Sequence, residues 1–172
     1  MHTKEKNGRR DDATGQTNSQ NGQNGTKTEN EAGRFDGFGL LPELLRAVTD
    51  LGFEKPTPVQ DSAIPPALAG RDVLACAMTG SGKTAAFVLP ILQRLHGKPR
   101  GVTRALVLTP TRELAAQVAD HFAELAAHTK LSAAVVHGGV GAKPQETAFR
   151  RGVDVIVATP GRLLDHFQYK YA

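Results

Sequence analysis

The feature that most constrains the fold is an alternation of short apolar runs with helical stretches in the C-terminal two thirds of the chain. The apolar runs have the length and residue types of buried strands, and they occur at Asp72–Ala77, Ala105–Thr109, Ala133–His137 and Val153–Ala158. Helical patterns fill the intervals at Lys83–Leu95, Arg112–His128 and Lys143–Arg151. Such alternation favours a parallel sheet with right-handed crossovers, and apolar strands are typical of sheets covered on both faces. The sequence therefore predicts an α/β fold.

Two shorter helices are expected before this alternation begins. Apolar residues recur at helical spacing between Leu40 and Leu51, and Gly52 suits the end of that helix. A second helix is predicted to start after Pro56-Thr57-Pro58 and to run toward Ala69.

The first 33 residues are rich in Asn, Gln, Gly and Thr and have almost nothing to bury, so residues 1–33 are predicted to be a disordered polar tail. Acids and bases balance there, so the formal net charge of +4 belongs to the remainder. A mildly basic chain is compatible with nucleic acid but does not establish it. No apolar run approaches the roughly 18–20 residues of a membrane span, and we expect a soluble cytoplasmic protein.

The single cysteine excludes an internal disulfide. Cys76 lies in an apolar run and is predicted to be a small buried core residue. His121 and His128 share a face of a predicted helix without a third ligand, so no protein metal-ligand set is expected.

The segment Ala77–Thr84 lies between a predicted strand and a predicted helix, which is the setting of a phosphate-binding P-loop. Gly80 and Gly82 allow the backbone to curl so that its N–H groups point at phosphate oxygens. Lys83 is expected to meet the β- and γ-phosphates, and the Thr84 hydroxyl to ligate Mg²⁺. A Gly-Ser turn is the alternative, which the Gly-Lys-Thr ending argues against. The predicted phosphate-binding residues are Ala77, Met78, Thr79, Gly80, Ser81, Gly82, Lys83 and Thr84, with Lys83 and Thr84 as catalytic residues.

Four further segments, together with the P-loop, resemble the DEAD-box RNA helicases in order and spacing. They are Gly52–Gln60, Pro110–Leu114, Gly138-Gly139 and Thr159–Arg162, and Phe35 stands at the place of the family's isolated upstream aromatic. Each short motif alone is weak evidence for the family, but five motifs in this order are specific. Their residues are typical of bacterial members. The resemblance implies an ATP-dependent RNA helicase with a RecA-like P-loop domain, with ATP and Mg²⁺ as cofactors and RNA as partner. It assigns residues 34–62 to a Q-motif region and residues 63–172 to part of the helicase ATP-binding domain.

The Q-motif segment suggests how the base of the nucleotide is recognised. The Gln60 amide can donate and accept at once, which matches the adenine edge, and Phe53 can stack on the base. By resemblance, Gln60 selects ATP, with Phe35, Phe53 and Lys55 completing the adenine site. The alternative is a glutamine at a helix start beside a core phenylalanine, and it would be favoured if no P-loop followed.

Small, polar and basic residues follow three of the predicted strands. The carboxyl ends of parallel strands share one edge of a sheet, and helices that start there offer free N–H groups. The resemblance implies that single-stranded RNA binds this edge through its backbone. Taken singly, each glycine reads as an ordinary turn and each threonine as an N-cap. The predicted RNA-binding residues are Pro110, Thr111, Arg112, Gly138, Gly139, Thr159, Pro160, Gly161 and Arg162.

The chain departs from the family pattern after Arg162. No Asp-Glu-Ala-Asp segment follows, Asp165 precedes a histidine, and family character is lost from Gln168 to Ala172. In the family, the acidic pair organises Mg²⁺ and water, and a second domain supplies arginines worth about 10³–10⁵ in rate. We therefore expect an N-terminal helicase fragment with negligible ATP hydrolysis and unpaired strand edges. Two alternatives remain open: a non-catalytic nucleotide- and RNA-binding module, and a different P-loop NTPase.

Overall fold

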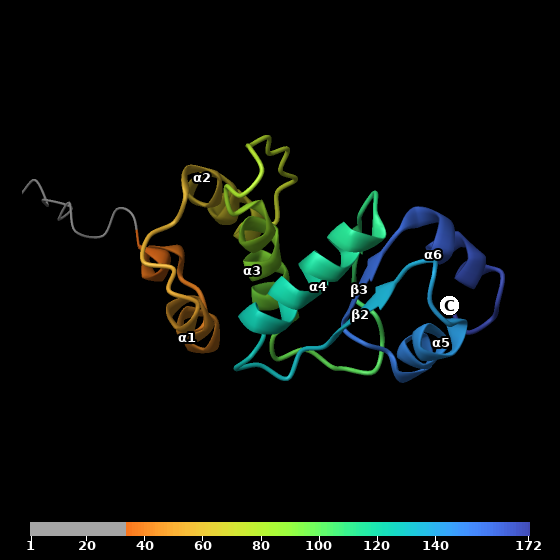
Figure 1. Cartoon of the computed structure of the whole chain (residues 1–172). Coiled ribbons are helices and arrows are strands. Elements are labelled where there is room, and N and C mark those ends of the chain that lie inside the picture. The colour runs from red at the N-terminus through yellow and green to blue at the C-terminus, as the bar shows by residue number, and fades with distance from the viewer. Residues whose placement is uncertain (1–33) are drawn as a thin grey trace, which may run out of the picture.

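The computed structural model describes residues 34–172, so the tail predicted for residues 1–33 lies outside the described residues. A three-stranded parallel sheet occupies the C-terminal half (Figure 1). Its strands are β1 (Ala105–Leu108), β2 (Ala133–Val136) and β3 (Val155–Ala158). The order is β1-β3-β2, so the last strand lies in the centre, with Ile156 opposite both Leu106 and Ala134. The predicted parallel α/β fold is confirmed.

Helices cover both faces of the sheet, as the uniformly apolar strands predicted. Val155 and Val157 of β3 belong to the larger core, which includes residues of α3 (Lys83–Leu95) and α4 (Arg112–Leu125). Ile156 points to the opposite face and packs in a smaller core with residues of α5 (Ala142–Arg151) and α6 (Pro160–Phe167). Because successive side chains of a strand point to opposite faces, β3 supports two cores at once.

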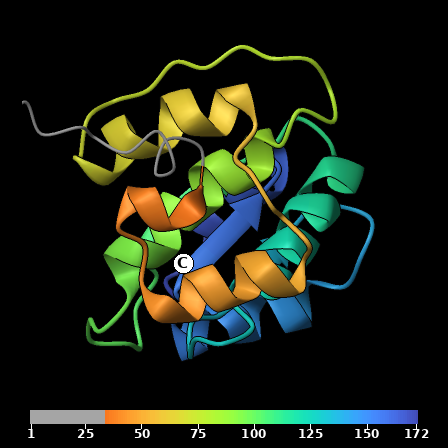
Figure 2. The same ribbon diagram turned by 90° about the vertical axis from the view of Figure 1, so that its left-hand side faces the viewer.

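The N-terminal elements pack against α3 and α4 rather than directly on the sheet (Figure 1). They are the 3₁₀ helix η1 (Phe35–Phe38) and the helices α1 (Pro42–Asp50) and α2 (Pro58–Leu68). Helix α2 lies alongside α3, and α1 lies below η1, as the turned view shows (Figure 2). Leu44, Ile64 and Leu89 are fully buried at their junction. The two predicted N-terminal helices are therefore confirmed in place and in extent to within a few residues.

The predicted strand at Asp72–Ala77 is wrong. The segment has no strand pairing and is exposed along its length, with Leu74 97% exposed. It runs in the long loop that arches away from α2 in Figure 2. A strand exists only when a neighbour pairs with its backbone, and a groove of about 590 Å³ separates this segment from the edge of β1. Cys76 lies in the same loop and is exposed, so its predicted burial is wrong for the same reason.

No helix within residues 34–172 is both long enough and apolar enough to cross a membrane. The described residues also contain no group of three or more His, Cys, Asp or Glu side chains placed to hold a metal ion.

Candidate functional site

The P-loop turns sharply before it enters α3 at Lys83. Gly80 and Gly82 have φ angles of 78° and 87°, in the left-handed region that other residues adopt at a cost. A Cβ atom at Gly82 would also overlap the side-chain amide of Gln60. Gly82 is therefore required both for the turn and for the close approach of α2.

The interior of the loop holds a positive charge. The ammonium group of Lys83 donates hydrogen bonds to the carbonyl oxygens of Ala77 and Met78, each at 2.6 Å. The hydroxyl of Ser81 is buried without a hydrogen-bond partner among the described residues. An ammonium, an unpaired hydroxyl and the N-terminus of α3 meet here, and each favours a phosphate. These residues fit a nucleoside triphosphate.

The other predicted P-loop residues lie around this charge. Ala77, Met78 and Thr79 are exposed in the loop, and Thr84 is half-buried beside Lys83 in the wall of the groove next to β1. Thr84 thus lies on the first turn of α3, where a hydroxyl can reach an ion bound at the loop.

Gln60 connects the predicted adenine site to the P-loop. Its side chain is 3% exposed. The amide oxygen accepts a hydrogen bond from the Thr57 backbone N–H at 2.9 Å, and the amide nitrogen donates to the Gly82 carbonyl at 3.1 Å. Gln60 thus caps the start of α2. This is the structural role that the sequence analysis gave as the alternative to adenine recognition. One amide proton and one oxygen lone pair remain for a ligand, since an amide has two of each.

The predicted aromatic residues lie in two layers. Phe35 is buried, and its ring stacks on Phe53 with centroids 6.2 Å apart and planes at 29°. Phe53 is half-buried above it, and Lys55 is exposed in the connection between α1 and α2. Phe35 therefore supports Phe53 from the core side.

The predicted RNA-binding residues gather at the carboxyl edge of the sheet. A shallow cavity of about 370 Å³ is lined by six of the nine: Pro110, Thr111, Arg112, Gly138, Thr159 and Arg162, together with Glu113 and Asp165. Gly139 lies under the Arg112 guanidinium, where a Cβ atom would overlap it. Pro160 and Gly161 are exposed in the first turn of α6. The prediction that these segments meet at one edge is confirmed, whereas their contact with RNA stays a prediction.

Local structure explains this convergence. Thr111 is the N-cap of α4, and its hydroxyl accepts a hydrogen bond from the Leu114 N–H at 3.2 Å. Thr159 is the N-cap of α6 and makes no such side-chain bond. Both helices thus begin at this edge and direct their N-termini toward the cavity, a setting that attracts anions.

The carboxylates of Glu113 and Asp165 balance the charges of Arg112 and Arg162 in this cavity. The pKa of Glu113 is lowered, mainly because its carboxylate accepts a hydrogen bond from the Glu113 backbone N–H. The Thr111 hydrogen bond and the charge of Arg112 act in the same direction, and together they outweigh partial desolvation. Glu113 is therefore ionised at neutral pH. Asp165 lies 4.0 Å from the Arg162 guanidinium, a weak ion pair at a solvated surface.

Gln145 holds Arg162 in place, and sequence reasoning missed it. The Gln145 amide nitrogen donates to the carbonyls of His137 and Gly141, at 3.1 and 3.3 Å. Its oxygen accepts from Arg162 Nε at 3.2 Å and contacts His166 Nε2 at 3.0 Å. The side chain is 3% exposed, although it belongs to a polar helical stretch that gave no sign of burial.

The fold and the site first define a class: an α/β P-loop protein with a cavity at the carboxyl edge of its parallel sheet that two arginines and two carboxylates line. Comparison with known proteins then gives the family, because residues 57–171 match the DEAD/DEAH box helicases. The chain belongs to the DEAD/DEAH box helicase family.

Relatives come from eukaryotes and bacteria. The chain is 50% identical over 134 residues to the mouse "Probable ATP-dependent RNA helicase DDX27", covering 77% of this chain and 18% of that protein. It is 52% identical over 137 residues to "ATP-dependent RNA helicase SrmB" of Escherichia coli K12, covering 78% and 31%. The chain thus spans between about a fifth and a third of these relatives. The crystal structure of the RNA helicase Prp28 from Chaetomium thermophilum bound to ADP is similar, with TM-score 0.74 and 40% identity over 80% of this chain and 34% of that one.

Proposed function

We propose that this chain is the ATP- and RNA-binding part of an ATP-dependent RNA helicase. Residues 34–62 form its Q-motif region, and residues 63–172 form part of its RecA-like ATP-binding domain. The observation that carries the proposal is the Lys83 ammonium held inside a glycine-shaped loop at the N-terminus of a helix. The relatives named above are described as ATP-dependent RNA helicases, and one similar structure holds ADP.

ATP and Mg²⁺ are the proposed cofactors. Lys83 binds the terminal phosphates in place of its two carbonyl partners, and the Thr84 hydroxyl ligates Mg²⁺. Phe53 stacks on adenine, Lys55 lies beside it, and Gln60 offers its remaining amide proton and lone pair to the base edge. Bound ATP supplies the phosphoanhydride bond that the reaction cleaves.

RNA is the proposed partner at the cavity where α4 and α6 begin. Arg112 and Arg162 neutralise backbone phosphates, and the helix N-termini bind them through free N–H groups. Backbone contacts of this kind do not depend on base sequence, which suits an enzyme that remodels many RNAs. The residues of the motifs are typical of bacterial members, and we propose a bacterial origin. Relatives from mouse and Escherichia coli have similar sequence identity to the chain.

We further propose that residues 1–172 alone bind ATP without hydrolysing it at an appreciable rate. Asp165 is the one acidic residue that follows Arg162 in the sequence, and it lies near Arg162 rather than in the groove that Lys83 and Thr84 line. A non-catalytic binding module would behave in the same way in isolation. The family match argues against the other alternative, a P-loop NTPase of another kind.

The experiment measures phosphate release by the purified chain with and without single-stranded RNA, beside RNA affinity from fluorescence anisotropy. We expect saturable RNA binding and no RNA-stimulated phosphate release. Arg112→Ala should weaken RNA binding about 3- to 10-fold, as expected for one lost phosphate contact. Arg151→Ala, at the exposed end of α5, is the control and should change it little. RNA-stimulated hydrolysis would refute the inactivity of the isolated chain, and absent RNA binding would refute the RNA proposal.

A further inference from the structure

A second cavity lies next to the proposed RNA site and is not used by it. Its volume is about 750 Å³, and residues of α5, α6 and the C-terminal segment line it. Arg162 and Asp165 line both this cavity and the one at the strand ends, so the two cavities adjoin at these side chains. A strand of RNA that contacts Arg162 therefore has this cavity directly beside it.

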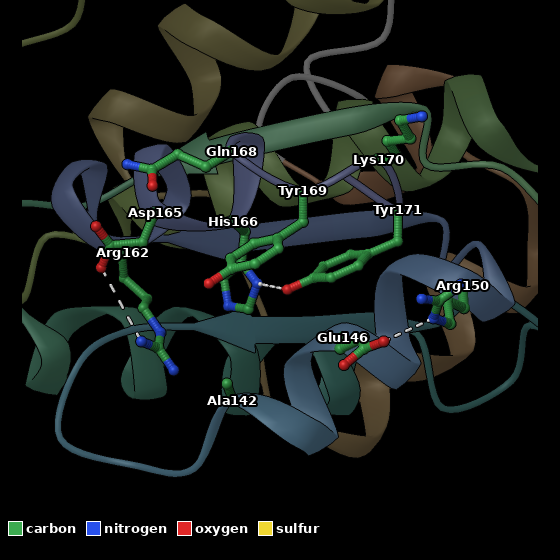
Figure 3. A pocket seen from close by; sticks show the side chains of 10 residues that line it. All are labelled: Ala142, Glu146, Arg150, Arg162, Asp165, His166, Gln168, Tyr169, Lys170 and Tyr171. Atoms are coloured by element: carbon green, nitrogen blue, oxygen red, sulfur yellow. Dashed lines mark hydrogen bonds and ion pairs between the residues drawn. The ribbon is translucent and has the colours of Figure 1, made fainter.

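Two tyrosines stack on each other in the lining of this cavity (Figure 3). The rings of Tyr169 and Tyr171 are nearly parallel, with centroids 5.4 Å apart and planes at 5°. Tyr169 is 58% exposed and has no other aromatic partner among the described residues. Because Tyr171 orients the exposed Tyr169 ring, another planar group can stack on Tyr169.

The inner ring is fixed from several sides. The Tyr171 hydroxyl lies 2.9 Å from His166 Nδ1, its ring contacts Phe149, and the Arg150 guanidinium lies 5.1 Å from its centroid. Burial, with Glu146 and Tyr169 nearby, raises the pKa of Tyr171, so its hydroxyl keeps its proton at neutral pH. Side chains from α5 and α6 therefore hold Tyr171 in place under Tyr169.

A chain of hydrogen bonds links Tyr171 to Arg162. The Gln145 oxygen can only accept, so His166 Nε2 carries the proton that it donates to Gln145, and His166 Nδ1 accepts from the Tyr171 hydroxyl. The same Gln145 oxygen accepts from Arg162. Burial, and then the charge of Arg162, lowers the pKa of His166, which keeps this neutral tautomer. The tyrosine stack and the proposed RNA-binding arginine thus have a fixed relative position.

The charges of the cavity favour a polyanion. Arg150, Arg162 and Lys170 face two carboxylates, those of Glu146 and Asp165. Glu146 is paired with Arg150 at 2.8 Å, and Asp165 lies near Arg162, whereas Lys170 has no ion pair among the described residues. The lining therefore carries one positive charge in excess, together with the exposed Tyr169 ring, and both features suit single-stranded RNA.

We propose that this cavity binds a nucleotide of single-stranded RNA, with its base stacked on Tyr169 and its phosphate facing Arg162. It extends the RNA path from the strand ends over α6, and so rests on the RNA site of the proposed function. Stacking on a ring accepts any base, so the added site strengthens binding without reading sequence.

The composition of the chain supplies a direct probe. Tyr169 and Tyr171 are its only tyrosines, and it has no tryptophan. Tyrosine emission therefore reports this cavity alone, and a stacked base quenches it. We expect single-stranded RNA to quench the emission of the whole chain as it binds, and inorganic polyphosphate, which carries charge without bases, to leave it unchanged. Equal quenching by polyphosphate would overturn the proposal, because it would show an anion site without stacking.

Substitutions then separate this site from the rest of the RNA surface. Tyr169→Ala should weaken RNA binding about 5- to 100-fold, the range for one lost base stack, and Tyr169→Phe should keep near-normal affinity. Because Tyr169 is exposed, circular dichroism should show an unchanged fold in both variants. Anisotropy that shows tight RNA binding unaffected by Tyr169→Ala would overturn this inference and leave the RNA site at the strand ends standing. A chain that binds no RNA would overturn both.

Discussion

At the scale of single residues, the clearest stabilising group is Asp154 at the start of β3. It is fully buried and bonds to Arg104, and its second oxygen accepts from the Ser132 backbone N–H at 2.9 Å and the Ser132 hydroxyl at 3.1 Å. Burial alone would raise the pKa of Asp154, but the hydrogen bonds from Arg104 and Ser132 and the charge of Arg100 outweigh it and lower the pKa below its ordinary 3.8. Asp154 thus holds the segment before β1, the residue before β2 and the start of β3 together.

Asp154→Asn should lower the free energy of unfolding at neutral pH by about 2–4 kcal/mol, because it leaves the half-buried Arg104 without its charged partner. A carboxyl with a lowered folded pKa stabilises the fold above its unfolded pKa, and this contribution is lost as pH falls through the folded value. The difference between variant and wild type should therefore shrink below pH 3.8. Urea unfolding across the acid range measures it, and a pH-independent difference would contradict this account.

Gly152 is a second residue whose identity the structure explains. It ends α5 with a φ of 66°, and a Cβ atom there would overlap the Gly101 carbonyl. We expect Gly152→Ala to destabilise the chain by about 2–5 kcal/mol, combining left-handed strain with a steric clash. Gly97 is the matched control, because its φ is 69° with open space around it. Gly97→Ala should cost only about 1–2 kcal/mol in thermal or urea unfolding, and equal effects would show that the clash relaxes.

At the scale of elements, local pattern predicted the helices well and one strand badly. Helix α3 has the predicted bounds, and the α4 prediction ran three residues past its end at Leu125. Helical periodicity is visible in a single segment, whereas a strand depends on a partner elsewhere in the chain. The apolar run at Asp72–Ala77 has strand composition but no partner among the described residues, and it lies in an exposed loop. The burial of Gln145 could not be predicted either, because it depends on contacts between α5 and α6.

The open edge of β1 has a measurable consequence. Leu108 is 56% exposed and faces the groove beside the Asp72–Ala77 loop. Unpaired edges with exposed apolar side chains promote association. We expect the chain to self-associate as its concentration rises, and Leu108→Lys to reduce this in sedimentation velocity. Val140→Lys, at an equally exposed residue away from the groove, should not. A monomeric wild type at high concentration would contradict this expectation.

At the scale of the whole molecule, one α/β fold carries both groups of predicted site residues. The P-loop precedes α3, and the cavity with Arg112 and Arg162 lies where α4 and α6 begin. The buried amide of Gln60 bonds the P-loop carbonyl of Gly82 to α2, and the buried amide of Gln145 bonds Arg162 to α5. The glycines and charged residues of both sites were readable from the sequence. The amide contacts at Gly82 and Arg162 were not, since each joins residues far apart in the chain.

The most direct measurement of the central claim is calorimetric titration of the chain with ATP and with GTP, each with Mg²⁺. We predict one saturable site for ATP and at least about tenfold weaker binding of GTP, because one wrongly matched hydrogen bond to the base costs about that much. Lys83→Ala should abolish or strongly weaken ATP binding, and Lys98→Ala, an exposed lysine after α3, should leave it unchanged. Equal affinity for the two nucleotides, or ATP binding that survives Lys83→Ala, would contradict the assignment of this loop as an ATP site.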